Sequence, residues 1–411
     1  MRNWRHTFIA IWSGQAVSVL TSSVLQIAIV WYITQKTGSA ALLSLATLIG
    51  FLPQVVLGLF IGVYIDRYKH KTVMILSDAG IALAGMVLVI IGIFGEIPIW
   101  LIFVVLFFRS IGAAFHSPAL KAVTPTIVPR DQLTRYAGFA HSFESLSLVV
   151  SPALAALLFT IWDLNVIVLL DVAGALLAVV VLTFVKIPDR GKGKPSGRLP
   201  VLREAKEGFR VLRREPGLWA LLVISSLYAF IYFPIGTLYP LITMTWFGGG
   251  IAESGTVEVV FSLGMLAGSF LLGVIGGKIK QVNAIILSIG AYGACVLMTG
   301  LLPASGLPVF IGLSLIMGMA SPFYHGVQTA IYQTRIAHDY LGRVLSLTSS
   351  IELIAMPMGL ILSGAFADVI GVNRWFAVSG VLTILIFIAS ARILPKRMDS
   401  SAPMASASPV P

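Results

Sequence analysis

The stretch Gly62-Val-Tyr-Ile-Asp66-Arg67-Tyr-Lys-His-Lys71 joins two apolar runs, each long enough to cross a membrane. A connection this short forces the two helices to lie side by side and antiparallel. Gly62 lets a neighbouring helix approach closely. The Lys and Arg residues that follow it favour the cytoplasmic side of a membrane. The stretch therefore predicts a transmembrane helical hairpin with a basic loop that acts as a hinge.

The composition indicates an integral membrane protein. Of 411 residues, 57% are hydrophobic and only 11% are charged, whereas a soluble protein carries about 25% charged residues. The net charge of +11 does not indicate nucleic-acid binding, because the basic residues lie in loops between apolar runs. Positive-inside topology and contact with anionic membrane lipids account for this charge.

Twelve apolar stretches reach the length of about 20 residues that a spanning helix needs. They are too long for barrel strands and do not alternate. The predicted fold class is therefore an all-α integral membrane protein with 12 transmembrane helices. The predicted helices cover approximately residues 7–33, 41–65, 72–94, 98–121, 132–158, 163–185, 215–243, 256–276, 281–301, 307–330, 339–366 and 371–394.

The distribution of Lys and Arg predicts the orientation. With both termini in the cytoplasm, 25 of the 28 Lys and Arg residues fall in cytoplasmic segments or helix ends. Lys36 and Arg374 fall in outer loops, and Arg109 lies inside a helix. This imbalance predicts that both termini are cytoplasmic.

Two similar halves follow one another along the chain. Ser117-Pro118 matches Ser321-Pro322, and Asp131 and Arg135 match Asp339 and Arg343. Six helices separate the copies, so both halves run the same way through the membrane, as in many transporters. The predicted domains are a first six-helix bundle, a basic cytoplasmic linker with an amphipathic helix over about 200–214, a second bundle and a disordered tail. Their bounds are 1–185, 186–214, 215–397 and 398–411.

The pattern Gly62-x-x-x-Asp66-Arg67-x-x-x-Lys71 resembles the loop signature of the major facilitator superfamily, with Lys69 and His70 as departures. Four further stretches resemble the Mef-type macrolide efflux proteins of that superfamily. These stretches are Ile11–Val17, Trp31–Ala40, Arg109–His116 and Tyr340–Ser346.

The resemblance implies a monomeric antiporter in the cytoplasmic membrane of a bacterium. It would export hydrophobic drugs, macrolide antibiotics in particular, in exchange for protons by alternating access of two parallel-repeat bundles. A siderophore or lipid exporter, and a passive facilitator or scramblase, are the alternatives. An enzyme is not indicated, because the sequence has one cysteine, no metal-ligand cluster and no phosphate-binding glycine loop. No cofactor or metal is expected.

Ionisable residues deep in membrane helices are candidates for proton coupling. Arg109, Glu144 and Glu352 all lie about 12 or 13 residues from a cytoplasmic helix end, at 1.5 Å per residue near the membrane midplane. A short loop joins the helices of Arg109 and Glu144, so these two could pair. The alternative is an ion pair that only locks the helices. Asp171, near the outer end of its helix, is interpreted as solvated.

Polar and aromatic side chains at helical spacing predict a substrate cavity on the helices that this superfamily uses. A large apolar ligand suits aromatic and Met surfaces with isolated amides, although Ser and Gln also join helices to one another. The predicted cavity residues are Gln15, Ser18, Ser22, Gln26, His116, Tyr228, Tyr232, Met317, Ser321, Tyr324 and Gln328.

A gating network is predicted around the opening stretch. Asp78 follows it by two turns of helix and could pair with Arg67 or Lys71. Asp66 could meet the start of the eleventh helix near Arg343, where a helix N-terminus favours an acid. The gating residues are therefore Gly62, Asp66, Arg67, Lys71, Asp78 and Arg343.

Overall fold

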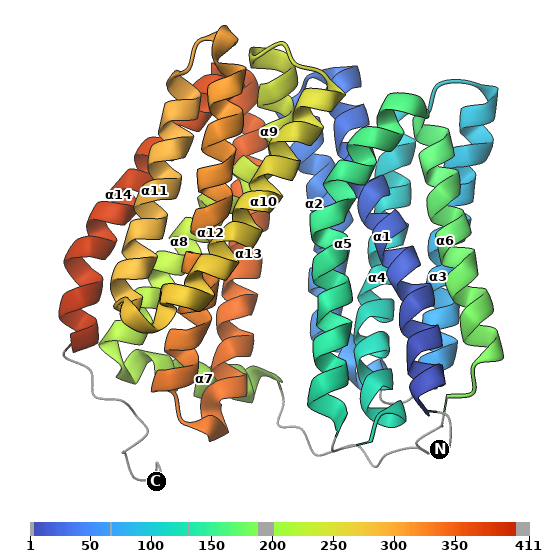
Figure 1. Cartoon of the computed structure of the whole chain (residues 1–411), viewed down its shortest axis with the longest axis horizontal. Coiled ribbons are helices and arrows are strands. Elements are labelled where there is room, and N and C mark those ends of the chain that lie inside the picture. The colour runs from blue at the N-terminus through green and yellow to red at the C-terminus, as the bar shows by residue number, and fades with distance from the viewer. Residues whose placement is uncertain (1–3, 66–67, 130–131, 188–200, 400–411) are drawn as a thin grey trace. The chain divides into compact units, whose positions relative to one another are not determined.

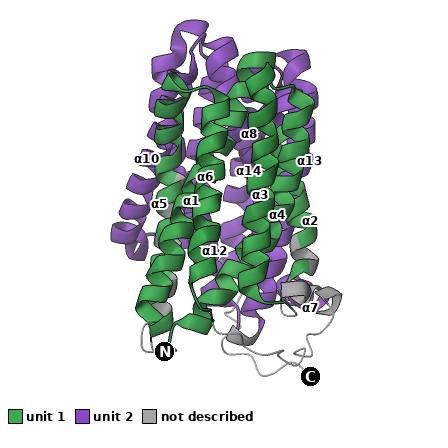
Figure 2. Cartoon of the chain, turned by 90° about the vertical axis from the view of Figure 1, so that its right-hand side faces the viewer, with its two compact units in different colours: residues 1–38, 45–196 green, residues 39–44, 197–411 purple. Residues whose placement is uncertain are grey.

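The computed structural model describes residues 4–65, 68–129, 132–187 and 201–399 (Figure 1). The side chains of some helical residues, Glu144 among them, lie outside this description. Within the described residues the chain forms 14 α-helices and no strand. It divides into two compact units, residues 1–38 with 45–196 and residues 39–44 with 197–411 (Figure 2).

Eleven of the described helices are long and apolar enough to cross a membrane. The twelfth spanning helix of the predicted series corresponds to α5, which has 29 residues, with Val149–Ile161 as its described apolar part. The all-helical prediction is thus confirmed. The long helices of unit 1 are α1 (Trp4–Thr37), α2 (Ala40–Ile65), α3 (His70–Phe94), α4 (Ile99–Ile127), α5 (Leu133–Ile161) and α6 (Leu164–Phe184). The first residues of α2, up to residue 44, belong to unit 2.

In unit 1, α1 packs against α4, α5 and α6, while α3 packs against α4 and α6. One end of this bundle is closed by apolar side chains, with Phe8, Trp12 and Leu120 at its centre. The ring of Tyr136 meets that of Phe8 edge-on at 4.8 Å. Because lipid tails are as apolar as these residues, close packing rather than water exclusion stabilises the bundle.

Unit 2 pairs α10 with α12 and α11 with α14. Glycines let α10 and α12 touch backbone to backbone, because a Cβ on Gly318 would meet the carbonyl of Phe261 and one on Gly264 would meet that of Leu315. Small residues serve this purpose in membrane helices. The long helices of unit 2 are α8 (Pro216–Thr237), α10 (Ile251–Ile275), α11 (Gln281–Leu301), α12 (Leu307–Arg335), α13 (His338–Ile370) and α14 (Val372–Asp399).

The predicted seventh helix is shorter and less regular than the sequence suggested. It ends at Thr237, where a short α9 (Tyr239–Leu241) and a π-helical segment (Ile242–Trp246) follow. Pro234 and Pro240 explain the break, because proline lacks the N–H that a regular helix needs. Before this helix, α7 (Val201–Arg214) occupies the stretch where an amphipathic helix was expected and packs on α13 and α8.

The start of α2 is held by a carboxylate. Asp368 accepts hydrogen bonds from the backbone N–H of Ala40 at 2.6 Å, from that of Ala41 at 3.0 Å and from the hydroxyl of Ser39 at 2.7 Å. An acid at a helix N-terminus satisfies N–H groups that have no partner inside the helix. Residues 39–44, which include the first turn of α2, belong to unit 2 together with Asp368. The remainder of α2 belongs to unit 1.

Candidate functional site

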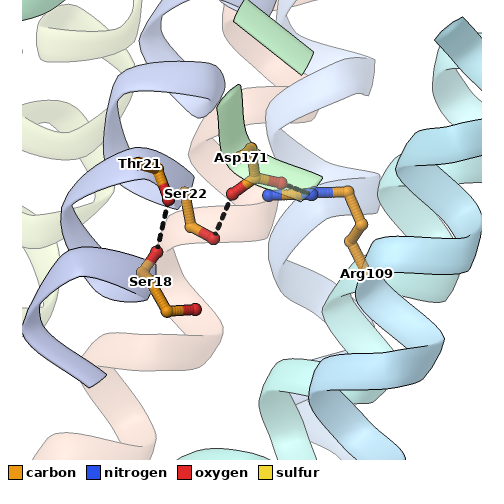
Figure 3. A network of polar contacts seen from close by, with 5 residues as sticks. All are labelled: Ser18, Thr21, Ser22, Arg109 and Asp171. Carbon is orange, nitrogen blue, oxygen red and sulfur yellow. Dashed lines mark hydrogen bonds and ion pairs between the residues drawn. The ribbon is translucent and has the colours of Figure 1, made fainter. Parts of the chain in front are cut away.

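Three helices of unit 1 bring a buried acid and a buried base together (Figure 3). Asp171 of α6 is 0% exposed and receives a hydrogen bond from Arg109 Nη1 of α4 through its Oδ2. Its other oxygen accepts from the hydroxyl of Ser22 on α1 at 2.7 Å. Arg109, Asp171 and Ser22 are called the upper cluster below. Its charges balance, as a buried pair requires.

This geometry corrects the interpretation of Asp171 as a solvated residue. The sequence offered Glu144 as the partner of Arg109, because a short loop joins their helices. Arg109 pairs with Asp171 instead, and the side chain of Glu144 lies outside the described residues. The sequence marks Asp171 as an acid within a long apolar helix, but its position near the outer helix end favoured solvation over pairing with Arg109.

A second acid cluster lies two turns away along α1 and α4, with its acid on α3. Gln15 of α1 donates its Nε2 hydrogen to Asp78 Oδ2 of α3 at 3.2 Å. His116 Nε2 of α4 lies 3.3 Å from Asp78 Oδ1, within ion-pair reach but outside hydrogen-bond geometry. All three residues are buried, and the side chain of His116 is the most exposed of them at 11%. Gln15, Asp78 and His116 are called the lower cluster below.

The gating residues are distributed differently from the expectation. Asp66 and Arg67 lie outside the described residues, and Gly62 lies in the last turns of α2. Lys71 does not pair with Asp78, because its Nζ donates to the backbone carbonyls of Thr183 and Val185 at 2.9 Å.

Arg343 of α13 forms an ion pair with Glu207 of α7, at 3.0 Å between Nη1 and Oε2. Gly208 allows α7 to come close to the backbone of Arg343, since a Cβ there would lie 3.1 Å from the Arg343 carbonyl oxygen. The described ion pair of Arg343 is thus with α7, the helix at the end of the predicted basic linker.

The four polar residues of α1 that were predicted to line the substrate cavity are buried or half-buried within unit 1. Gln15 and Ser22 bind the two acids, Ser18 is buried, and Gln26 is half-buried. The backbone carbonyl of Ser18 accepts a hydrogen bond from the hydroxyl of Thr21 at 3.1 Å (Figure 3).

Unit 2 contains a cluster of tyrosines drawn from three helices. The ring of Tyr228 on α8 lies 4.3 Å from that of Tyr324 on α12, and the ring of Tyr232 lies 4.9 Å from that of Tyr292 on α11. The Tyr232 hydroxyl is 3.2 Å from that of Ser321, on α12. The sequence predicted the residues of α8 and α12 but missed Tyr292, which stands alone in an apolar helix without a polar stripe.

Polar groups border this tyrosine cluster, defined as Tyr228, Tyr232, Tyr292 and Tyr324. The Tyr228 hydroxyl is buried and has no hydrogen-bond partner among the described residues. Met317 accepts a hydrogen bond from Tyr239 through its sulfur at 3.4 Å. Gln328 of α12 donates to Glu352 Oε1 of α13 at 2.6 Å. The Tyr324 hydroxyl is likewise buried without a hydrogen-bond partner among the described residues, so the cluster offers aromatic faces, two unused hydroxyls and a nearby carboxylate.

A separate cavity of about 680 Å³ lies between α3 and α4 in unit 1. Its lining extends from Tyr68 and Lys69 at the start of α3 to Gly80 and Phe108. Ser77, the residue before Asp78, and Phe115, the residue before His116, also line it. The cavity therefore comes close to the lower cluster.

Comparison with known proteins identifies the family of transporters to which this arrangement corresponds. The family model of the Major Facilitator Superfamily matches residues 11–349 and 228–406. Macrolide efflux protein A of Streptococcus pyogenes is 50% identical over 391 residues, which cover 95% of this chain and 96% of that protein. The multidrug efflux pump Tap of Mycobacterium tuberculosis is 24% identical over 410 residues, covering 96% and 93%.

Solved transporters share the fold at low sequence identity. The nucleoside transporter NupG gives a TM-score of 0.73 at 11% identity and covers 95% of this chain and 100% of that chain. A bacterial homologue of the iron transporter ferroportin, in its inward-facing state, gives 0.69 at 15% identity and covers 95% and 98%.

Proposed function

This chain belongs to the major facilitator superfamily as a drug exporter, and we propose that it exports macrolides in exchange for protons. It is a multi-pass protein of the bacterial cytoplasmic membrane. The observation that best supports macrolides as substrates is the 50% identity to macrolide efflux protein A along nearly the whole chain.

The tyrosine cluster of unit 2 supports a binding site for a large and mostly apolar molecule. Aromatic faces bury much surface with little loss of side-chain freedom, and Met317 beside them adapts to irregular shapes. The unused Tyr228 hydroxyl can pair with a polar group of the ligand. Macrolides combine a large apolar ring with hydroxyl groups and an amine, which suits this lining.

Glu352 is the proposed carboxylate of proton coupling in unit 2. It sits partly buried on α13, and its contact with Gln328 places it beside the tyrosine cluster. A carboxylate in such a position can hold either a proton or the ammonium group of a drug, and the exchange of one for the other couples them. Glu144, at the matching position of the first half, remains a predicted partner in this role.

We further propose that both termini are cytoplasmic and that the two halves alternate access to the substrate. The Lys and Arg distribution supports this orientation. The loop containing Asp66 and Arg67 would serve as a latch at the cytoplasmic side, with Arg109 holding α4 to α6 during the movement.

The test is transport by the purified full-length protein in liposomes. Radiolabelled erythromycin should accumulate inside when the interior is acidic, and an ionophore that collapses the gradient should abolish the accumulation. Uptake that only equalises the erythromycin concentration across the membrane, and does so without a gradient, would indicate a passive facilitator. Failure with erythromycin but transport of a catecholate siderophore would indicate the alternative substrate class.

A further inference from the structure

Unit 1 repeats one three-helix arrangement in inverted orientation. The helices α1, α2 and α3 begin 95, 93 and 94 residues before α4, α5 and α6 respectively. Because three helices separate the copies, corresponding helices cross the membrane in opposite directions. Inverted repeats of this kind are known within the halves of such transporters.

The two acid clusters follow this repeat residue by residue. Each takes its acid from the third helix of one copy and its partners from the first helix of both copies. Along α1 and α4 the clusters are seven residues apart, or roughly 10 Å at 1.5 Å per residue. The corresponding pairs are Gln15 and Arg109 at an offset of 94, Ser22 and His116 at 94, and Asp78 and Asp171 at 93.

The equivalent positions differ in one chemical property. Arg109 carries a permanent positive charge opposite Asp171. In the lower cluster its place is taken by the uncharged Gln15, and the one basic group is His116, whose imidazole has a neutral form as well as a protonated one, unlike a guanidinium. Resting on the proposed proton-coupled export, we propose that Asp78 and His116 form the site at which unit 1 binds and releases a coupling proton.

The hydrogen bonds of the lower cluster fit a site with room for one more proton. Gln15 Oε1 is buried and has no partner among the described residues, so acceptors outnumber donors. With both ring nitrogens protonated, His116 would direct its Nε2–H toward Asp78 Oδ1, 3.3 Å away, and its positive charge would make the cluster neutral. Its release would leave one buried negative charge held by an uncharged amide, an arrangement that burial disfavours. Proton occupancy therefore changes the stability of this packing.

Among the described residues, the other charged groups on the helices around Asp78 are engaged, exposed or distant. On α4 these are His116, the exposed Lys121 five residues beyond it and, two turns away, Arg109, which is paired with Asp171 of α6. On α3 itself, Lys71 donates to carbonyls at the end of α6, and α1 contributes only Gln15. The side chain of Glu144, on α5 beside α4, lies outside the described residues.

The cavity between α3 and α4 lies beside residues adjacent to this site. Its lining includes Ser77 and Phe115, which directly precede the two proposed proton-binding residues in the sequence.

The test compares two activities in liposomes that contain the full-length protein. A gradient of one pH unit can sustain about tenfold accumulation in one-for-one exchange. Asp78→Asn and His116→Gln should lose this gradient-driven accumulation of erythromycin yet still exchange erythromycin at equal pH, because exchange requires substrate binding and no net movement of protons. His116→Arg, which copies the fixed charge of the upper cluster, should behave in the same way. Glu96→Gln is the matched control, because it neutralises an exposed acid of unit 1.

Gradient-driven accumulation by Asp78→Asn or His116→Gln at the wild-type level would overturn the proposal. Should these variants not fold, proton release in weak buffer decides, because erythromycin binding should release more protons from the wild-type protein than from His116→Arg, in which only Glu352 of unit 2 can still release its proton. Equal proton release by the two proteins would also overturn the proposal. Exchange without gradient-driven accumulation by the wild type would refute proton coupling alone, whereas absence of both would refute macrolide export itself.

Discussion

Arg109 and Asp171 form an ion pair from which solvent is excluded, with side chains 9% and 0% exposed. Removing one partner of such a pair leaves an unpaired buried charge, which destabilises a protein by about 3–5 kcal/mol. Arg109→Met should therefore lower the melting temperature strongly. The double variant Arg109→Met with Asp171→Asn should recover part of the loss, because no isolated charge remains. Tryptophan fluorescence of the detergent-solubilised protein measures both.

Lys36 and Glu96 supply the control for this prediction. Their ion pair has a distance of 2.6 Å, yet the side chains are 42% and 82% exposed. Exposed pairs contribute little to stability, so Lys36→Met should melt close to the wild type. Equal melting temperatures for Lys36→Met and Arg109→Met would contradict the importance of burial.

The tyrosine cluster predicts which side chain limits drug binding. Tyr228→Ala removes a ring that lies 4.3 Å from Tyr324 and 5.4 Å from Tyr232. An aromatic ring that packs against a ligand contributes about 0.5–1.5 kcal/mol to binding. Loss of the Tyr228 ring should therefore raise the Kd for erythromycin roughly tenfold. Equilibrium dialysis measures the change. Phe270→Ala, which alters a ring that is 76% exposed on α10, should leave the Kd unchanged.

Tyr228→Phe separates the hydroxyl from the ring. The hydroxyl has no partner among the described residues, so its loss should not lower the stability of the free protein. Weaker erythromycin binding by this variant would identify the hydroxyl as a ligand contact. A lower melting temperature would instead reveal a structural role and argue against the proposed site.

The close contact between α10 and α12 predicts a sharp difference between two glycines of α12. A Cβ at Gly318 would collide with the carbonyl of Phe261, whereas one at Gly312 meets nothing within 4 Å. Gly318→Val should destabilise the protein by about 1–3 kcal/mol through overpacking, and Gly312→Val should not. Since both substitutions introduce the same side chain into one helix, thermal unfolding isolates the packing effect. Similar melting temperatures would refute it.

The cap on α2 predicts a local effect. Asp368→Ala removes three hydrogen bonds from the first turn of α2, and loss of a cap costs about 0.5–2 kcal/mol. Amide hydrogen exchange at residues 40–44 should accelerate. Ser39→Ala keeps both backbone contacts of Asp368 but loses the hydroxyl contacts with Asp368 and with the Leu42 N–H, so it should accelerate exchange to a smaller extent. Unchanged protection in Asp368→Ala would show that the cap does not hold this turn.

Helix positions could be predicted because a membrane helix needs a long apolar run, and the sequence contains such runs in an unbroken series. The exception, the end of α8, depended on Pro234 and Pro240 and on a local π-helical turn. Arg109 was recognisable as a buried charge for the same reason: it interrupts an apolar run.

Partners were harder to predict than positions. A short loop made Glu144 the expected partner of Arg109, yet α3 and α6 pack together and bring Asp171 to it. Which helix faces which is decided by rotation about each axis, and hydropathy does not record rotation. The offsets of 93 and 94 residues were the signal in the sequence that linked Asp78 with Asp171.

The lengths of helical segments in unit 1 are constrained more strictly than their composition. Gln15 and Ser22 both lie on α1 and each meets a different acid. One residue inserted between them would turn one side chain by about 100° relative to the other, so one acid would lose its partner. Related sequences should therefore tolerate substitution at the exposed Val17 between these residues but show neither insertions nor deletions in the stretch.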